Sequence, residues 1–137
     1  VMVPVVALLG GNAGNQSLAV VVRALAVGEI SLNNHWRVLG KEIFVGMLNG
    51  LCMGGVISLI GFLWYQNSWL AMILWLSMAA NLIIAGLVGS MIPLILRKLK
   101  LDPALGSSIF VTTATDVGGF FIFLGLGTVF LQQLLGV

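Results

Sequence analysis

The sequence predicts an all-α integral membrane protein built as a bundle of four transmembrane helices. Hydrophobic residues make up 60% of the 137 residues and charged residues only 7%, and the mean hydropathy is +1.15. A soluble domain carries about a quarter charged residues, so this chain cannot cover a water-facing surface. Four apolar segments are also long enough to cross a bilayer, which takes about 20 residues each.

The predicted spanning helices cover residues 1–26, 43–65, 69–96 and 104–135. Transmembrane strands are the poorer alternative, because they would be about half as long and would alternate in polarity. The pair Asp102–Pro103 fits the start of the last helix, with Asp as the N-cap and Pro at the first position. We expect one domain over residues 1–137, with further residues before it, because the chain starts inside an apolar stretch that is not typical of a signal peptide.

The basic residues predict an orientation. Every Lys and Arg lies in or beside the first and third connections between the helices. Cytoplasmic loops carry the excess of such residues, so we expect both connections to face the cytoplasm and the C-terminus to lie outside, in a multi-pass protein of the cell membrane. If the complete protein begins in the cytoplasm, an odd number of spans precedes the first helix, and one is the simplest number. The net charge of +2 is too small to indicate a nucleic acid partner.

Helices 43–65 and 69–96 are explained by packing. Gly46, Gly50 and Gly54 follow a spacing that lets two helix backbones approach closely. Several polar side chains in these two helices can form hydrogen bonds between helices. They are Asn49, Ser58, Ser77 and Asn81.

The first predicted helix contains the unusual stretch LLGGNAGNQS, residues 8–17. Each glycine weakens a helix by roughly 1 kcal/mol, and polar amides are costly in hydrocarbon without partners. We expect the helix to be broken here, because exposed backbone at this depth is tolerated against protein or a water-filled cavity. The alternative is a tight helix crossing through Gly10 and Gly14. The candidate lining residues are Gly11, Asn12, Gly14 and Asn15.

The last predicted helix carries a polar stripe that includes an acid, Asp116. The stripe falls within about 100° of arc and consists of Ser108, Thr112, Thr115, Asp116 and Gly119. A charged Asp in mid-membrane costs about 2.5–3.5 kcal/mol, and the nearest cation in a span, Arg23, lies several turns away in depth. Asp116 is therefore either protonated or part of a hydrated site that attracts cations; a neutral structural Asp is the alternative.

The oxygen-rich character of these candidates indicates a hard cation. Mg²⁺ is usually held through one or two carboxylates while it keeps several waters, so Asp116 is the predicted metal residue. A two-fold dimer would bring two copies of Asp116 to one dication, and symmetric dimers are the commonest assembly. A K⁺ filter is disfavoured because no TVGYG-like stretch is present.

The residues leave two other functions to compare with a channel. A proton-coupled secondary transporter of a cation or small solute would use Asp116 as the proton carrier, but the inverted repeat typical of such proteins is not found in the sequence. An enzyme would need a second catalytic group near Asp116, and the single histidine, His35, lies on the first connection. The sequence therefore favours a non-enzymatic cation channel.

Two motifs at opposite ends of the chain resemble one known family. PVVALLGGNAGNQS, followed by Arg23 and Ala24, resembles the P…GGNxGNQ signature of the MgtE family of magnesium channels. DPALGSSIFVTTATDVGGFF resembles that family's DPA…S…TTxTD signature on its final helix. The likeness covers the whole chain in order and spacing, and neither motif shows a departure.

The resemblance implies a homodimer of five-helix protomers, with the ion path between subunits lined by the first and last helices of this chain. It assigns the pore aspartate to Asp116 and backbone carbonyls of the path to the neighbourhood of Gly11 and Gly14. It also implies cytoplasmic regulatory domains that this sequence lacks. The choice of Mg²⁺ over Mn²⁺, Co²⁺ or Ca²⁺ depends on the resemblance. Three acids near the predicted inner side are candidates for additional cation sites or are ordinary loop charges: Glu29, Glu42 and Asp102.

Overall fold

The computed structural model describes residues 2–31 and 33–136, and over these ranges the chain is helical with no strand. Its helices are α1 (Val3–Ala26), α2 (His35–Tyr65), α3 (Ser68–Lys98), α4 (Ser107–Val129) and the short α5 (Leu131–Leu135). The first four are long and apolar enough to cross a membrane. The prediction of an all-α bundle with four spanning helices is therefore confirmed.

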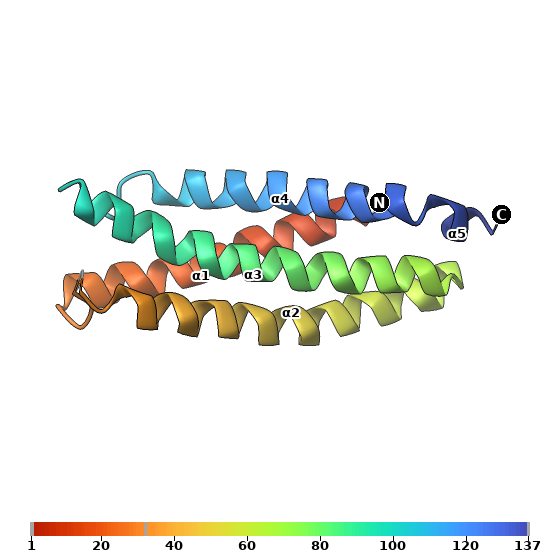
Figure 1. The fold of residues 1–137 in the computed structure, drawn as a ribbon, viewed down its shortest axis with the longest axis horizontal. Helices are drawn as coiled ribbons and strands as arrows, with labels where there is room; N and C mark the ends of the chain where they lie inside the picture. Colours follow the sequence, from red (N-terminus) through yellow and green to blue (C-terminus); the bar gives the residue numbers. More distant parts are fainter. Residues whose placement is uncertain (1, 32, 137) are drawn as a thin grey trace.

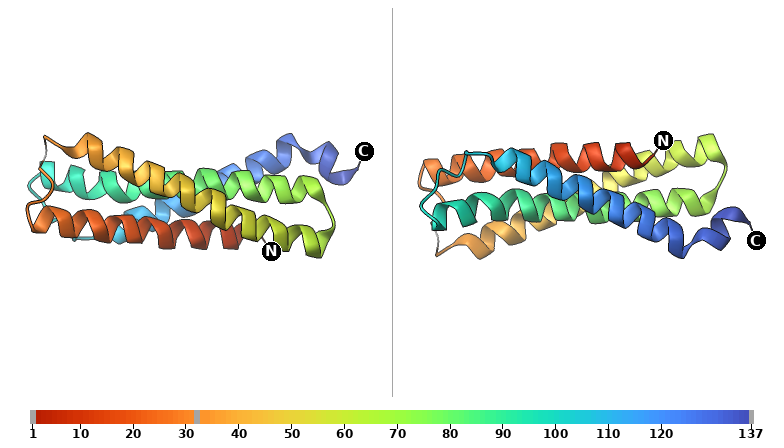
Figure 2. Two further views of the ribbon diagram at one scale, coloured as in Figure 1. Left: turned by 90° about the horizontal axis from the view of Figure 1, so that it is seen from below. Right: turned by 90° about the horizontal axis from the view of Figure 1, so that it is seen from above.

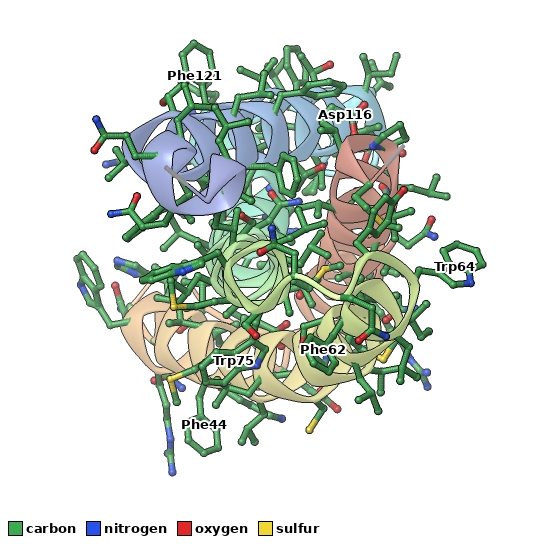
Figure 3. The ribbon with its side chains drawn as sticks, turned by 90° about the vertical axis from the view of Figure 1, so that its right-hand side faces the viewer. Phe44, Phe62, Trp64, Trp75, Asp116 and Phe121 are labelled. Carbon is green, nitrogen blue, oxygen red and sulfur yellow. The ribbon has the colours of Figure 1, made fainter. Side chains whose placement is uncertain are left out.

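The four long helices lie side by side and alternate in direction (Figure 1). The α1–α2 and α3–α4 connections share one end of the bundle, and the α2–α3 turn lies at the other end with the C-terminus (Figures 1 and 2). Helix α3 is central: it packs against α1, α2 and α4, and α1 also packs against α4, whereas α1 and α2 make little direct contact. Viewed along the bundle, α4 and α2 lie on opposite sides of α3 (Figure 3).

Three predicted helix boundaries differ from the structure by three residues or more. Helix α2 begins at His35 rather than at residue 43, because Leu39 is buried against Val21, Leu25 and Leu94 and extends the helix past the apolar segment. Glu42 consequently lies inside a helix.

The helix start predicted at Asp102–Pro103 is wrong. Helix α4 begins at Ser107, preceded by Gly106 in the left-handed conformation with φ of 70°. Asp102 instead accepts a hydrogen bond at 3.0 Å from the backbone N–H of Ala104 within a turn. The last helix also ends early, since Phe130 separates α4 from α5.

The expectation that the first helix is broken at its glycines is wrong as well. Helix α1 is continuous from Val3 to Ala26. A methyl group added at Gly14 would lie 2.5 Å from the side chain of Val111, and one added at Gly10 would overlap the side chain of Asn81. The tight helix crossing through Gly10 and Gly14, left open as the alternative, is therefore confirmed. Contacts made possible by the glycines offset their low helix propensity.

The packing interpretation of the glycines on α2 is also confirmed. A methyl group added at Gly46 would lie 2.5 Å from the carbonyl oxygen of Leu82, and one added at Gly50 would lie 2.7 Å from the Cα atom of Ala79. These distances are too short for a real side chain. The backbones of α2 and α3 therefore touch along a row of glycines, and α3 becomes the scaffold that positions the other helices.

Candidate functional site

Two parallel rows of side chains run along α4, each with a spacing of four residues. The first row is buried and packs inside the bundle; it consists of Ser107, Val111, Thr115 and Gly119. The second row is shifted by one residue along the helix, lies at the edge of the contact with α1, and keeps some exposure; it consists of Ser108, Thr112 and Asp116. The buried row holds α4 in place, and the edge row carries the polar groups that remain accessible.

Asn15 on α1 connects the two helices at this edge. Its side-chain nitrogen donates to the carbonyl oxygen of Gly11 at 3.0 Å and to the hydroxyl of Thr112 at 3.2 Å. Its side-chain oxygen accepts a hydrogen bond of 2.7 Å from the hydroxyl of Ser108. Both ends of the amide are used, so Asn15 has a defined orientation and keeps the edge row of α4 in register with α1.

The carboxyl group of Asp116 lies one turn further along, beside Gly11. A methyl group added at Gly11 would lie 3.9 Å from the Oδ1 atom of Asp116, 3.7 Å from the methyl of Thr112 and 3.6 Å from the hydroxyl of Thr115. Asp116 is partly exposed and, within residues 2–31 and 33–136, no hydrogen bond or ion pair to it is found. It lies on the side of α4 next to α1, whereas Phe121 points away from the bundle (Figure 3).

Four of the residues predicted to line the site are buried in helix contacts: Gly11, Gly14, Thr115 and Gly119. The hydroxyl of Thr115 donates to the carbonyl oxygens of Val111 and Thr112, both at 3.0 Å. A methyl group added at Gly119 would lie 2.8 Å from the side-chain nitrogen of Asn81, so Gly119 faces the inside of the bundle. Gly14 is packed between α3 and α4.

The remaining predicted residues are spread over the molecule. Asn12 is exposed on α1, next in sequence to Gly11. Glu29 and Asp102 are exposed and lie in the α1–α2 and α3–α4 connections, which share one end of the bundle (Figure 1). Glu42 is buried between helices on the other side of α1.

Asn81 is a residue whose importance the sequence did not reveal. The sequence predicts only that Asn81 forms a hydrogen bond between helices, and it does: its side-chain nitrogen donates to the carbonyl oxygen of Val6 at 2.8 Å. Asn81 is fully buried, and its side chain occupies the space left by Gly10 on α1 and Gly119 on α4. One amide of α3 therefore sets the spacing of the two helices that carry the polar edge, and only the folded arrangement makes this visible.

The arrangement offers one carboxylate, several hydroxyl oxygens and one amide on a partly exposed edge. In the parts of the chain that the structure describes, no group of three or more His, Cys, Asp or Glu side chains could hold a metal ion. The edge suits an ion that keeps its water shell, since hydroxyl and carboxylate oxygens accept hydrogen bonds from water.

Four spanning helices with a partly exposed acid between two of them define a multi-pass membrane protein with an intramembrane ionisable site, a feature that marks ion pathways. The family model MgtE, described as a divalent cation transporter, matches residues 3–126. The chain therefore belongs to the MgtE family.

Curated relatives agree with this family. The chain is 34% identical over 131 residues to "Magnesium transporter MgtE" of Bacillus subtilis. The aligned region covers 96% of this chain and 29% of the relative. It is 39% identical over 131 residues to the protein of the same name from Thermus thermophilus. This aligned region covers 95% of this chain and 29% of that relative. The chain thus spans less than a third of the length of these relatives.

The fit between Asn81 and Gly10 can be tested by a double-mutant cycle. We expect Gly10→Ala to destabilise the protein by about 1–3 kcal/mol, because the new methyl group overlaps Asn81. In an Asn81→Ala background the same change should cost much less, because the overlapping side chain is absent. Thermal unfolding in detergent measures each step. Equal costs of Gly10→Ala in both backgrounds would contradict the assigned contact.

Proposed function

We propose that this domain conducts hydrated Mg²⁺ across the cell membrane as a channel, along a path lined by α1 and α4. The observation that carries the proposal is the partly exposed carboxyl group of Asp116 beside Gly11 and Thr112, for which no partner is found among residues 2–31 and 33–136. No Lys, Arg or His follows Pro103 in the sequence, so nothing on the last helix competes with a mobile cation for this acid. The relatives' names, which specify magnesium, support the choice of ion.

The chemistry of the edge suits a hydrated ion. Mg²⁺ gives up its waters reluctantly, and those waters donate hydrogen bonds, so a path needs acceptors rather than direct ligands. Asp116 supplies a carboxylate. Thr112 uses one lone pair to accept the Asn15 amide proton, and its second lone pair can accept from a water of the ion. Asn15 fixes the Thr112 and Ser108 hydroxyls so that they need not reorganise as the ion passes.

The charge of the ion supports a dimer. One chain supplies a single carboxylate, whereas a dication requires two for neutrality. In a two-fold homodimer the Asp116 edges of two protomers would face each other, and the partial exposure of this edge leaves it accessible to a second copy. The ion path would then run between the subunits, with two copies of Asp116 at its narrow part.

The driving force would be the membrane potential. Moving one charge across 100 mV is worth about 2.3 kcal/mol, so a dication gains roughly twice that without coupling to a second solute.

In this proposal the two basic connections face the cytoplasm and the C-terminus lies outside. Regulatory cytoplasmic domains would belong to the complete protein, and Mn²⁺, Co²⁺ and Ca²⁺ are the ions against which selectivity should be measured.

The role of Asp116 is tested by Asp116→Asn, which keeps the shape of the side chain and removes its charge. We expect Mg²⁺ uptake into vesicles to fall by at least tenfold while insertion and dimerisation are preserved. Uptake by the unchanged protein should follow the voltage and be insensitive to a pH gradient at fixed voltage. Normal uptake by the Asn variant would overturn the proposed path, and uptake that follows the pH gradient would favour a proton-coupled transporter.

Gly11 gives a second test that separates the path from packing. A methyl group at this position makes contacts of 3.6 Å or longer, so we expect Gly11→Ala to fold with unchanged or slightly higher thermal stability. The methyl group would lie 3.9 Å from the Oδ1 atom of Asp116 and narrow the space beside this carboxyl group, so Mg²⁺ uptake should fall several-fold. Gly14→Ala is the matched control for a packing effect: the added methyl group would clash with Val111, so this variant should lose thermal stability where Gly11→Ala does not. A stable Gly11→Ala protein with normal uptake would exclude Gly11 from the path.

A further inference from the structure

Helix α1 has a second polar side, which faces α2 rather than α4. A groove of about 300 Å³ lies between α1 and α2, with α3 as its floor. The groove exists because α1 packs on α3 and α4 but makes little direct contact with α2. Its polar lining residues are Gln16, Ser17, Lys41, Glu42 and Asn49.

Glu42 stands out among these residues because it is buried, with 6% of its surface exposed. It lies on the same face of α2 as Gly46 and Gly50, so it continues the glycine row that packs on α3. A methyl group added at Gly86 of α3 would lie 2.5 Å from the carbonyl oxygen of Glu42, which shows that the backbone touches α3 here too. Helix packing alone does not need a carboxyl group at this place, and burying one is costly without a hydrogen-bond donor.

Ser17 supplies that donor from across the groove. Its hydroxyl donates to the Oε2 atom of Glu42 at 2.6 Å, within the usual range for a hydrogen bond between two oxygen atoms. The bond joins α1 to α2 where their backbones do not meet. Ser17 is only two positions beyond Asn15, whose side chain bonds to Ser108 and Thr112 on α4. At this depth α1 packs on α3, and its side chains also bond to α4 through Asn15 and to α2 through Ser17.

We propose that Glu42 is a positioning residue for the cation path: its hydrogen bond to Ser17 fixes α1 relative to α2, since both helices pack on α3 but make little direct contact with each other. This placement in turn keeps Gly11 and Asn15 at the correct distance from Asp116 and the α4 hydroxyls. The inference rests on the proposed role of α1 as a wall of the path. A second cation site in the groove is the weaker interpretation, because Lys41 lines the same groove and repels a cation.

The proposal predicts a pattern among four single variants. Ser17→Ala and Glu42→Ala each remove the hydrogen bond, and each should lower Mg²⁺ uptake per inserted protein by about tenfold. Glu42→Gln retains an oxygen that accepts from Ser17, and Ser17→Thr retains the hydroxyl, so both should keep uptake within about twofold of the original protein. The double variant Ser17→Ala/Glu42→Ala should be no worse than either single change. Asn49→Ala, which lines the same groove, is the control and should be neutral.

A readout that does not depend on transport separates this proposal from the proposed function. Nitroxide labels at the exposed positions Ala19 on α1 and Phe44 on α2, in a Cys52→Ala background, report the separation of the two helices by electron paramagnetic resonance. The distance distribution should broaden in Ser17→Ala and Glu42→Ala and stay narrow in Glu42→Gln and Ser17→Thr. This result would stand even if Asp116→Asn retained uptake, in which case only the proposed function would fail.

Two outcomes would overturn the positioning role. In the first, Glu42→Gln is as impaired as Glu42→Ala while Ser17→Ala transports normally, which would assign the function to the charge. In the second, neither alanine variant changes uptake or the label distances. If Glu42→Ala fails to insert, Ser17→Ala against Ser17→Thr still decides, because these changes leave the buried acid in place.

Discussion

Close contact between helix backbones is the constraint on which the rest of this structure depends. Apolar side chains cannot drive helices together in lipid as they do in water, so association relies on tight packing and on hydrogen bonds between helices. Helix α2 packs on α3 through Gly46 and Gly50. Helices α1 and α4 pack on α3 where Gly10 and Gly119 contact Asn81. Larger residues at these positions would separate the helices, and the polar edge between α1 and α4 would lose its geometry.

Given that packing, the polar groups divide into those that hold helices and those that remain accessible. Asn81 and Thr115 are buried and satisfy backbone carbonyls, while Asn15 ties Ser108 and Thr112 together at the edge. Asp116 alone has a carboxyl group in this region, and no partner is found for it among residues 2–31 and 33–136. An acid placed beside a glycine, with ordered hydroxyls one turn away, is an arrangement suited to a hydrated cation rather than to helix packing.

Much of this could be predicted from the sequence, because composition and segment length determine the spanning helices and because the two motifs are specific to the family. The prediction failed where tertiary contacts override local signals. The glycines of LLGGNAGNQS indicated a broken helix, yet contacts with Asn81 and Val111 keep α1 continuous. Glu42 was assigned to a loop because hydropathy ends near residue 43, whereas the packing of Leu39 extends α2 and buries the acid. Neither the role of Asn81 nor the Ser17–Glu42 bond has a signal in one sequence.

The most direct test of the account is a high-resolution structure of the assembled protein in lipid with Mg²⁺ present. The account predicts an ion on the two-fold axis between two copies of Asp116, with its water shell intact, so that the carboxylate oxygens lie well beyond the roughly 2.1 Å of direct coordination. Direct carboxylate coordination at about 2.1 Å would contradict passage of a hydrated ion. An assembly in which Asp116 faces lipid, with the ion bound elsewhere, would contradict the central claim that this acid forms the cation site.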